Sequence, residues 1–184
     1  KQAELVTKWM EECTSDAQSI ANNPFVVLCM QSTREGKERA EILQYLDTVK
    51  YVDYLWAECG HKEVIIADRN GIVRISSRKE LVGTDISTKD FFRTAIEGAF
   101  FTSNIIPSDI PIENESGELE VGVPTMLVSV PVKDRSNAIA GAVTIRIDVS
   151  EMNALMQNVH LGKTGETYLV NAQGYMLTES RFTE

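Results

Sequence analysis

The sequence of 184 residues is poor in histidine and cysteine and carries an excess of acidic side chains. Eighteen Lys and Arg residues against 27 Asp and Glu residues give a formal net charge of −9. This charge argues against nucleic acid and anionic lipid as the main partner. The chain has no signal peptide and no apolar run of the roughly 18 to 20 residues needed to span a bilayer. We therefore expect any membrane anchor to lie outside this chain.

Sequence patterns typical of catalytic or metal-binding sites are also absent. Cys13, Cys29 and Cys59 match no metal or redox spacing, and we interpret them as buried thiols, with one disulfide as the alternative. His61 and His160 have no zinc-site neighbours and are interpreted as surface or turn residues. Phosphate-binding, dinucleotide-binding and serine-hydrolase motifs are absent as well. These absences predict a non-catalytic chain without a metal or cofactor.

The first 50 residues have helical periodicity. Apolar residues recur at steps of three and four from Ala3 and predict one helix of about 20 residues that ends before Pro24. A second helix is predicted from the capping-box pair Ser32 and Glu35 to about Lys50. The stripe of the first helix can pack on the protein's own core or form the seam of a homodimer. It consists of Val6, Met10, Cys13, Ala17 and Ile20.

Strand patterns begin after this helical region. Residues 51–58, YVDYLWAE, alternate between two faces and predict a strand. Residues 64–77, VIIADRNGIVRISS, predict a β-hairpin. Asn70 and Gly71 can take the positive φ angles of a two-residue type I′ turn, and Asp68 can accept hydrogen bonds from nearby backbone amides.

The hairpin pattern occurs twice. TYLVNAQGYMLTES, residues 167–180, repeats it, with Gly174 placed 103 residues after Gly71. The repeat predicts the start of a second module, too short to bury a core alone. The predicted organisation is a helical region at 1–50, one α+β module at 51–160 and an incomplete module at 161–184.

A short helix is predicted after the first hairpin. Ser87 and Asp90 have capping spacing and Gly98 is placed as a helix stop, so the helix presents an apolar face inward. That face consists of Phe91, Phe92, Ala95 and Ile96.

The remaining segments predict an antiparallel sheet closed by a helix. Residues 103–124 contain three of the five prolines and predict a long loop or loose hairpin. Residues 125–132 and 138–148 predict two strands joined by a polar turn, and Ser150 caps a closing helix. The predicted fold class is α+β, with helices segregated from an antiparallel, PAS-like sheet.

In this order and spacing the segments resemble a double Cache domain, the PAS-like extracytoplasmic sensor of prokaryotic membrane receptors. The resemblance rests on IIADRNGIVRISS, LVGTDISTKDFFRTAIEG, TMLVSVPV, AIAGAVTIRIDVSEM and GETYLVNAQGYMLTESRF, and covers nearly the whole chain. It implies a membrane-distal module followed by the start of a membrane-proximal one, tethered by transmembrane helices outside this chain. It also implies output through a sensor histidine kinase, with a chemoreceptor or a diguanylate cyclase as alternatives.

The resemblance also implies where a ligand would bind. In the amino-acid-binding branch of the family an Arg-x-Trp-Tyr motif opens the pocket helix, where this chain has Lys89, Phe91 and Phe92. Lysine keeps the charge of arginine but loses its planar fork. The implied ligand is a small polar or carboxylate-bearing molecule in a cavity beside the segment that starts at Ser87. The resemblance implies contacts from Lys89, Phe91, Phe92 and Asp148, and we expect Tyr54, Trp56 and Asp109 to contact the ligand as well.

Each implied contact also has a structural interpretation. The phenylalanines, like Tyr54 and Trp56, can belong to the core, and Lys89 and Asp109 can be solvated. Asp148 can cap the helix that begins near Ser150. A ligand-free structural or dimerisation module, with side chains filling the cavity, is therefore the alternative to a sensor.

Overall fold

The computed structural model describes residues 2–34, 61–113, 116–157, 168 and 170. The chain divides into two compact units that interleave along the sequence. One contains residues 13–103 and 127–147, and the other contains residues 1–12, 104–126 and 148–184. None of the helices in the described ranges is long and apolar enough to cross a membrane. The predictions for 35–58, Cys59, His160 and the repeat around Gly174 fall outside the described residues.

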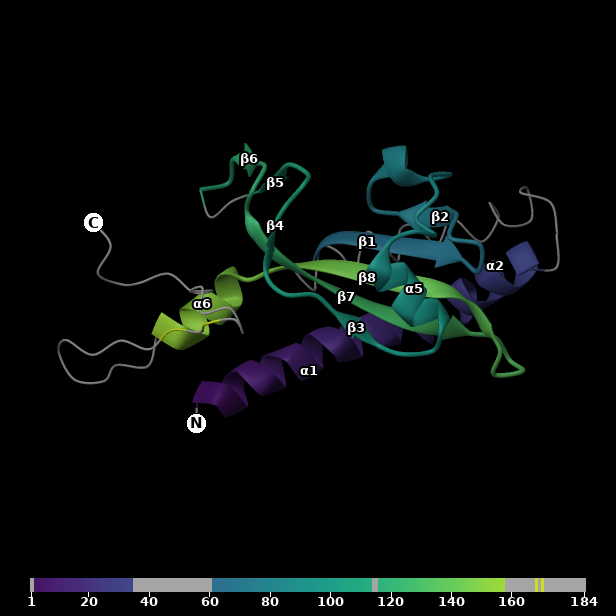
Figure 1. Ribbon diagram of the computed structural model, residues 1–184, viewed down its shortest axis with the longest axis horizontal. Helices are drawn as coiled ribbons and strands as arrows, with labels where there is room; N and C mark the ends of the chain where they lie inside the picture. Colours follow the sequence, from purple (N-terminus) through teal and green to yellow (C-terminus); the bar gives the residue numbers. More distant parts are fainter. Residues whose placement is uncertain (1, 35–60, 114–115, 158–167, 169, 171–184) are drawn as a thin grey trace. The chain divides into compact units, whose positions relative to one another are not determined.

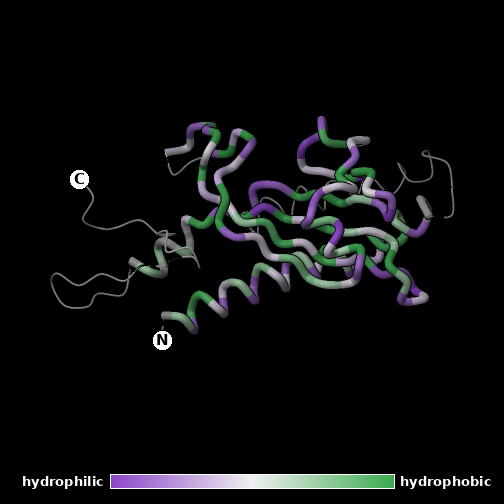
Figure 2. The backbone as a smooth tube through the Cα atoms, in the orientation of Figure 1, coloured by the Kyte–Doolittle hydropathy of each residue, from purple (hydrophilic) through white to green (hydrophobic). Residues whose placement is uncertain are grey.

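The first unit is built on an antiparallel sheet with the strand order β2-β1-β8-β7-β3 (Figure 1). Strands β7 and β8 are the two apolar strands predicted from the sequence, and the turn between them is polar (Figure 2). β1 pairs with β8 although the two are far apart in the chain. The strands are β1 His61–Asp68, β2 Val73–Ser76, β3 Phe101–Thr102, β7 Pro124–Lys133 and β8 Ile139–Asp148.

The predicted hairpin is β1 and β2, but its turn differs from the predicted type I′ turn. Gly71 has a φ of +85°, whereas Asn70 does not have a positive φ. The Gly71 amide donates to the Asp68 carbonyl and the Asp68 amide donates to the Ile72 carbonyl. Residues 69–71 therefore form a three-residue loop that ends in a left-handed glycine, the next most common hairpin solution.

Helices α1 (Gln2–Ala21) and α2 (Pro24–Arg34) form the N-terminal region. α1 confirms the predicted 20-residue helix, and Cys13, Ala17 and Ile20 of its stripe are buried. The predicted start of a second helix at Ser32 is wrong because Ser32 already lies in α2. α2 itself was not predicted from the sequence; its start signal is Asn23, whose side-chain oxygen accepts a hydrogen bond from the Phe25 amide at 2.9 Å, with proline at the first helical position.

Cys13 and Cys29 are buried free thiols, as predicted. Burial raises the pKa of the Cys29 thiol to about 11, and the charge of Arg74 opposes this only in part. Because only the thiolate reacts readily, Cys29 is chemically inert at neutral pH.

Helix α5 (Asp90–Ile96) is the predicted short helix. It ends in a Schellman motif: Gly98, at a φ of +96°, donates to the Ala95 carbonyl, and Ala99 donates to the Thr94 carbonyl. The predicted cap at Ser87 is wrong, since Lys89 holds the N-cap position. Instead, the Ser87 amide donates to the Asp85 carboxylate at 2.8 Å.

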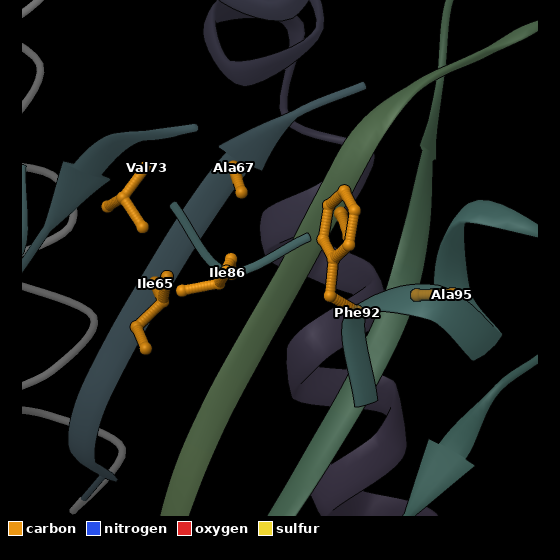
Figure 3. Close-up of a cluster of buried hydrophobic side chains, with 7 residues drawn as sticks. Ile65, Ala67, Val73, Ile86, Phe92 and Ala95 are labelled. Atoms are coloured by element: carbon orange, nitrogen blue, oxygen red, sulfur yellow. The ribbon is translucent and has the colours of Figure 1, made fainter. Parts of the chain in front are cut away.

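One face of α5 packs onto the sheet (Figure 3). Phe92 and Ala95 are buried there, and Phe91 and Ile96 pack at the edge, so the predicted inward face is confirmed. A short 3-10 helix, η2 (Lys79–Leu81), lies in the segment between β2 and α5. The buried cluster under α5 consists of Ile65, Ala67, Val73, Ile86, Phe92, Ala95 and Ala142.

The second unit contains short strands and the closing helix. β4 (Ile106–Pro107) pairs with the start of β7, and β5 (Ile112–Glu113) pairs with β6 (Leu119–Glu120), which confirms the predicted loop or loose hairpin. Helix α6 (Ser150–Gln157) follows β8 and buries Met152 and Met156.

The turn at Gly71 generates a test of the fold. A Cβ on Gly71 would lie 2.7 Å from the Ser87 Cα, and the positive φ adds strain. We expect Gly71→Ala to lower the free energy of unfolding by about 2 to 4 kcal/mol in urea denaturation. Gly83, at a φ of +89° with no atom within 4 Å of its Cβ position, is the matched control. Gly83→Ala should cost only about 1 kcal/mol, and equal losses would contradict the close approach.

Candidate functional site

The residues predicted to bind a ligand fall into both units. Lys89, Phe91 and Phe92 lie at the start of α5 in the first unit, where Lys89 is exposed, Phe91 half-buried and Phe92 buried. Asp109 and Asp148 belong to the second unit. Tyr54 and Trp56 lie outside the described residues.

The interpretation of Asp148 as a helix-start residue has direct support. Its Oδ1 accepts a hydrogen bond from the Ser150 amide at 2.8 Å, one of the amides at the N-terminus of α6 that lack a partner within the helix. Asp109 is exposed and precedes β5.

An aromatic pair extends from α5 to the sheet edge. The rings of Phe91 and Phe101 have centroids 6.5 Å apart and planes tilted by 57°, a geometry that aromatic side chains favour. Phe101 is the partner of Ser129 in the pairing of β3 with β7. Phe101 and Ser129 therefore lie on the same face of the sheet, the one that α5 covers.

This α5 face of the sheet carries buried polar side chains. The hydroxyls of Ser129 and Thr144 lie 2.9 Å apart, and Ser129 also donates to the Val143 carbonyl at 3.2 Å. Both side chains are fully buried. Cross-strand partners place one row of residues on this face: Ser76, Ile65, Thr144, Ser129 and Phe101.

One step further along the strands, the same face carries a buried ion pair. Glu63 pairs with Arg146 across β1 and β8, and the Arg146 Nε lies 3.1 Å from the Glu63 Oε2. Both side chains are more than nine-tenths buried. Arg78, which follows β2, places its Nη1 3.5 Å from the Glu63 Oε1. Glu63 thus has an arginine beside each of its oxygens.

The opposite face of the same strands is aliphatic in its middle and carries buried polar side chains at its two ends, where His61 pairs with Ile147 and Asp68 pairs with Gly141. It packs against α2, where the Met30 sulfur lies 3.0 Å from the position of a Cβ on Gly141 of β8. Burying hydroxyl groups and charges is costly, whereas aliphatic side chains fill a core without that cost. The polar character of the α5 face therefore needs a separate explanation. The aliphatic face contains Val64, Ile66, Val128, Val130, Val143 and Ile145.

This polar group was not predicted from the sequence. Ser129, Thr144 and Arg146 interrupt strands that are otherwise apolar, and their alternation with valine and isoleucine is the sequence signal that indicates a shared face.

Asp68, the last residue of β1, has a structural role in the turn that follows the strand. Its Oδ1 accepts hydrogen bonds from the amides of Asn70 and Ile72, as predicted, and its Oδ2 lies 2.7 Å from the Arg74 Nε. The buried carboxylate therefore holds the turn that places Gly71 against Ser87.

The prediction that His61 is a surface or turn residue is wrong. His61 begins β1 and is only 4% exposed. Its Nε2 lies 3.4 Å from the Asp16 Oδ2 of α1 but has no hydrogen-bond partner among the described residues. Desolvation lowers the pKa of His61 below its ordinary 6.5, and Asp16 opposes this in part. Among the described residues no group of His, Cys, Asp and Glu is arranged to hold a metal ion.

Comparisons with known proteins give structural relatives only. No family profile and no curated protein sequence matches the chain. The sensory domain of the Campylobacter jejuni chemoreceptor Tlp3 with isoleucine bound is 16% identical, with a TM-score of 0.64, over 96% of this chain and 65% of that one. The V. cholerae histidine kinase DctB sensor domain is 14% identical, with a TM-score of 0.61, over 85% and 55%. The E. coli DcuS sensor domain is 12% identical, with a TM-score of 0.56, over 80% and 94%.

These likenesses show the fold. The chain has the α+β fold of Cache-type sensor domains, which confirms the predicted architecture. It spans less than two thirds of the length of the Tlp3 and DctB domains that it matches.

The buried ion pair generates a second test. Glu63→Gln removes the carboxylate but leaves Arg146 buried with its charge, so we expect the free energy of unfolding to fall by about 3 kcal/mol. Chemical denaturation measures this loss. Glu80→Gln removes an exposed carboxylate that also contacts Arg78 and should leave the unfolding midpoint nearly unchanged. Similar losses in both variants would show that burial of Glu63 is not what matters.

His61 generates a pH-dependent test. Because its pKa is lowered in the folded state, the unfolded chain binds a proton more readily. Stability from this residue is therefore present above pH 6.5 and is lost as the pH falls below it. We expect His61→Phe to reduce the fall in unfolding free energy between about pH 7 and pH 5.5, measured by urea denaturation. His160→Gln is the control and should retain the fall, and a fall that persists in His61→Phe would contradict the assignment.

Proposed function

We propose that this chain is the extracytoplasmic small-molecule-sensing part of a membrane receptor and has no catalytic activity of its own. The observation that carries the proposal is the difference between the two faces of the sheet. The α5 face buries the hydroxyls of Ser129 and Thr144 and the ion pair of Glu63 and Arg146 next to one another, whereas the opposite face is aliphatic between His61 and Asp68. Such a polar surface suits a polar ligand held under α5.

The alternative is a structural or dimerisation module without a ligand. A scaffold gains most stability from aliphatic packing on both faces, since a buried ion pair is no more stabilising than apolar side chains of equal volume. On the α5 face, apolar packing of this kind is found in the cluster under Phe92, towards the end that contains Ala67 and Ala142. The polar end of that face therefore favours the sensor.

The resemblance to the family supplies the proposed ligand contacts. Lys89 at the N-terminus of α5 offers a positive charge, and Phe91 and Phe92 offer apolar surface. The other proposed contacts are Tyr54, Trp56, Asp109 and Asp148. Among the related structures, Tlp3 has isoleucine bound and the Pseudomonas aeruginosa chemoreceptor PctC has GABA bound, which supports a small polar or carboxylate-bearing ligand.

We propose that the receptor signals through a histidine kinase. The resemblance of the sequence to double Cache sensors and the structural likeness to the DctB sensor domain support this output. A chemoreceptor is the second candidate, because the likeness to Tlp3 has a TM-score of 0.64. Residues 51–160 would form the membrane-distal module and residues 161–184 the start of the membrane-proximal one, with transmembrane helices outside this chain.

Helix α1 is proposed to form a homodimer seam through its N-terminal half. Leu5 and Met10 are 39% and 36% exposed there, unlike the buried Cys13, Ala17 and Ile20 further along the same helix. A ligand can alter signalling only if it binds one arrangement of the receptor better than another, and a helix shared by two protomers can report that difference.

A thermal-shift screen of amino acids and small organic acids tests the proposal. For a compound that stabilises the domain, we expect Lys89→Ala to weaken binding about tenfold, because a charge-assisted contact is lost. Asp148→Ala tests the proposed acidic contact in the same way. Lys133→Ala, an exposed lysine at the end of β7, is the control and should bind as the wild type does. Unchanged ligand-induced stabilisation in both Lys89→Ala and Asp148→Ala would contradict the proposed contacts.

A further inference from the structure

Arg78 connects a buried carboxylate to an exposed one. Its Nη1 lies 3.5 Å from the buried Glu63 Oε1, while its Nε and Nη2 lie 2.8 Å and 2.7 Å from the Glu80 Oε1. The Arg78 side chain is 27% exposed, against 63% for Glu80 and 3% for Glu63. One edge of the guanidinium is therefore anchored inside the unit, and the other faces a carboxylate in solvent.

The position of Arg78 relates this guanidinium to the polar α5 face. Arg78 directly precedes η2 in the segment that leads from β2 to α5, and its amide donates to the Ser76 hydroxyl at 3.0 Å. Glu63, its buried partner, lies on the α5 face beside Arg146. Arg78 thus borders the polar surface on which the sensor proposal rests.

The contact with Glu80 is easily exchanged. Both nitrogens of Arg78 donate to a single oxygen of Glu80, so the planar fork of the guanidinium does not meet both oxygens of a carboxylate. Ion pairs between exposed side chains contribute little to stability, so separating this one costs little. The pKa of Glu80 is lowered by a hydrogen bond from its own backbone and by Arg78, which keeps the side chain anionic.

We propose that Arg78 is an anion-binding group of this sensor in addition to Lys89, and that the carboxylate of an organic acid or amino acid takes the place of Glu80 on it. This inference rests on the proposed sensor function and names the class of its ligand. Glu80 is then an internal competitor that occupies the site when the ligand is absent. Glu63 is a positioning residue that keeps the guanidinium in place for either partner.

The exchange is favourable because the free carboxylate can use both of its oxygens. A bidentate arginine–carboxylate pair has two parallel, charge-assisted hydrogen bonds and is stronger than a contact through one oxygen. The guanidinium is already anchored by Glu63, so less conformational entropy is lost on binding.

Titration of the whole chain with acetate, succinate and L-isoleucine, followed by NMR and calorimetry, tests the inference. We expect Glu80→Gln to tighten binding of a carboxylate probe about threefold to tenfold, because the competitor is gone. Arg78→Gln should weaken binding at least about tenfold, and Arg78→Lys should fall between Arg78→Gln and the wild type, because lysine lacks the fork. Arg135→Gln, an exposed arginine in the turn between β7 and β8, is the charge-matched control and should have no effect.

Two results would overturn the inference. The first is a Glu80→Gln variant that binds the carboxylate probes no more tightly than the wild type. This measurement does not depend on whether the Arg78 variants fold. The second is stabilisation only by neutral or cationic compounds that Arg78→Gln binds equally well. That second result would leave the sensor function standing and remove only the carboxylate assignment.

Discussion

The ion pair between Glu63 and Arg146 is the constraint on which the sheet depends. It joins β1 and β8 across 83 residues of sequence and lies on one face of the sheet. A slip of one residue in either strand would turn one of these charges onto the opposite face and separate it from its partner. Because an unpaired buried charge costs several kcal/mol, the pair selects a single register. The positions of Thr144 and Ser129 follow from that register.

A second chain of contacts leads from the sheet to α5. Asp68 holds the turn after β1, and the turn presents Gly71 closely enough to Ser87 for its carbonyl to accept a hydrogen bond from the Ile86 amide at 2.8 Å. Lys89 then begins α5 within a few residues. The placement of the helix over the polar face is thus determined by a turn at the end of a strand. This explains why the motif ADRNG carries a buried aspartate and a glycine with a positive φ.

Local patterns predicted most of the described helices and strands but not the buried polar side chains of the α5 face. The stripe of α1, the stop at Gly98 and the alternation in β7 and β8 depend on neighbouring residues, and each was visible in the sequence. The turn type was predicted wrongly because the pair Asn70-Gly71 is compatible with two loops. A type I′ turn needs a positive φ at both residues, whereas the three-residue loop needs one only at Gly71. Ser129, Thr144 and Arg146 were missed for a different reason. A polar residue at every second position of a strand is normally solvent-facing, and only tertiary packing, which the sequence pattern does not reveal, buries these side chains. His61 was misplaced in the same way, since its burial depends on α1.

The adjacency of β1 and β8 has a consequence for how such a domain can diversify. The paired strands β1 and β8 come from opposite ends of the module, and the chain between them contains β2, α5 and β7 as well as the segment 103–124. Insertions or deletions in residues 103–124 would leave the β1–β8 ladder intact, because the entropy of closing a loop rises only slowly with its length. The same connectivity makes folding slower than in a helical bundle, since the ladder forms only after a distant segment has been synthesised and brought back. A lineage of such domains can thus change its peripheral loops while its central ladder stays the same.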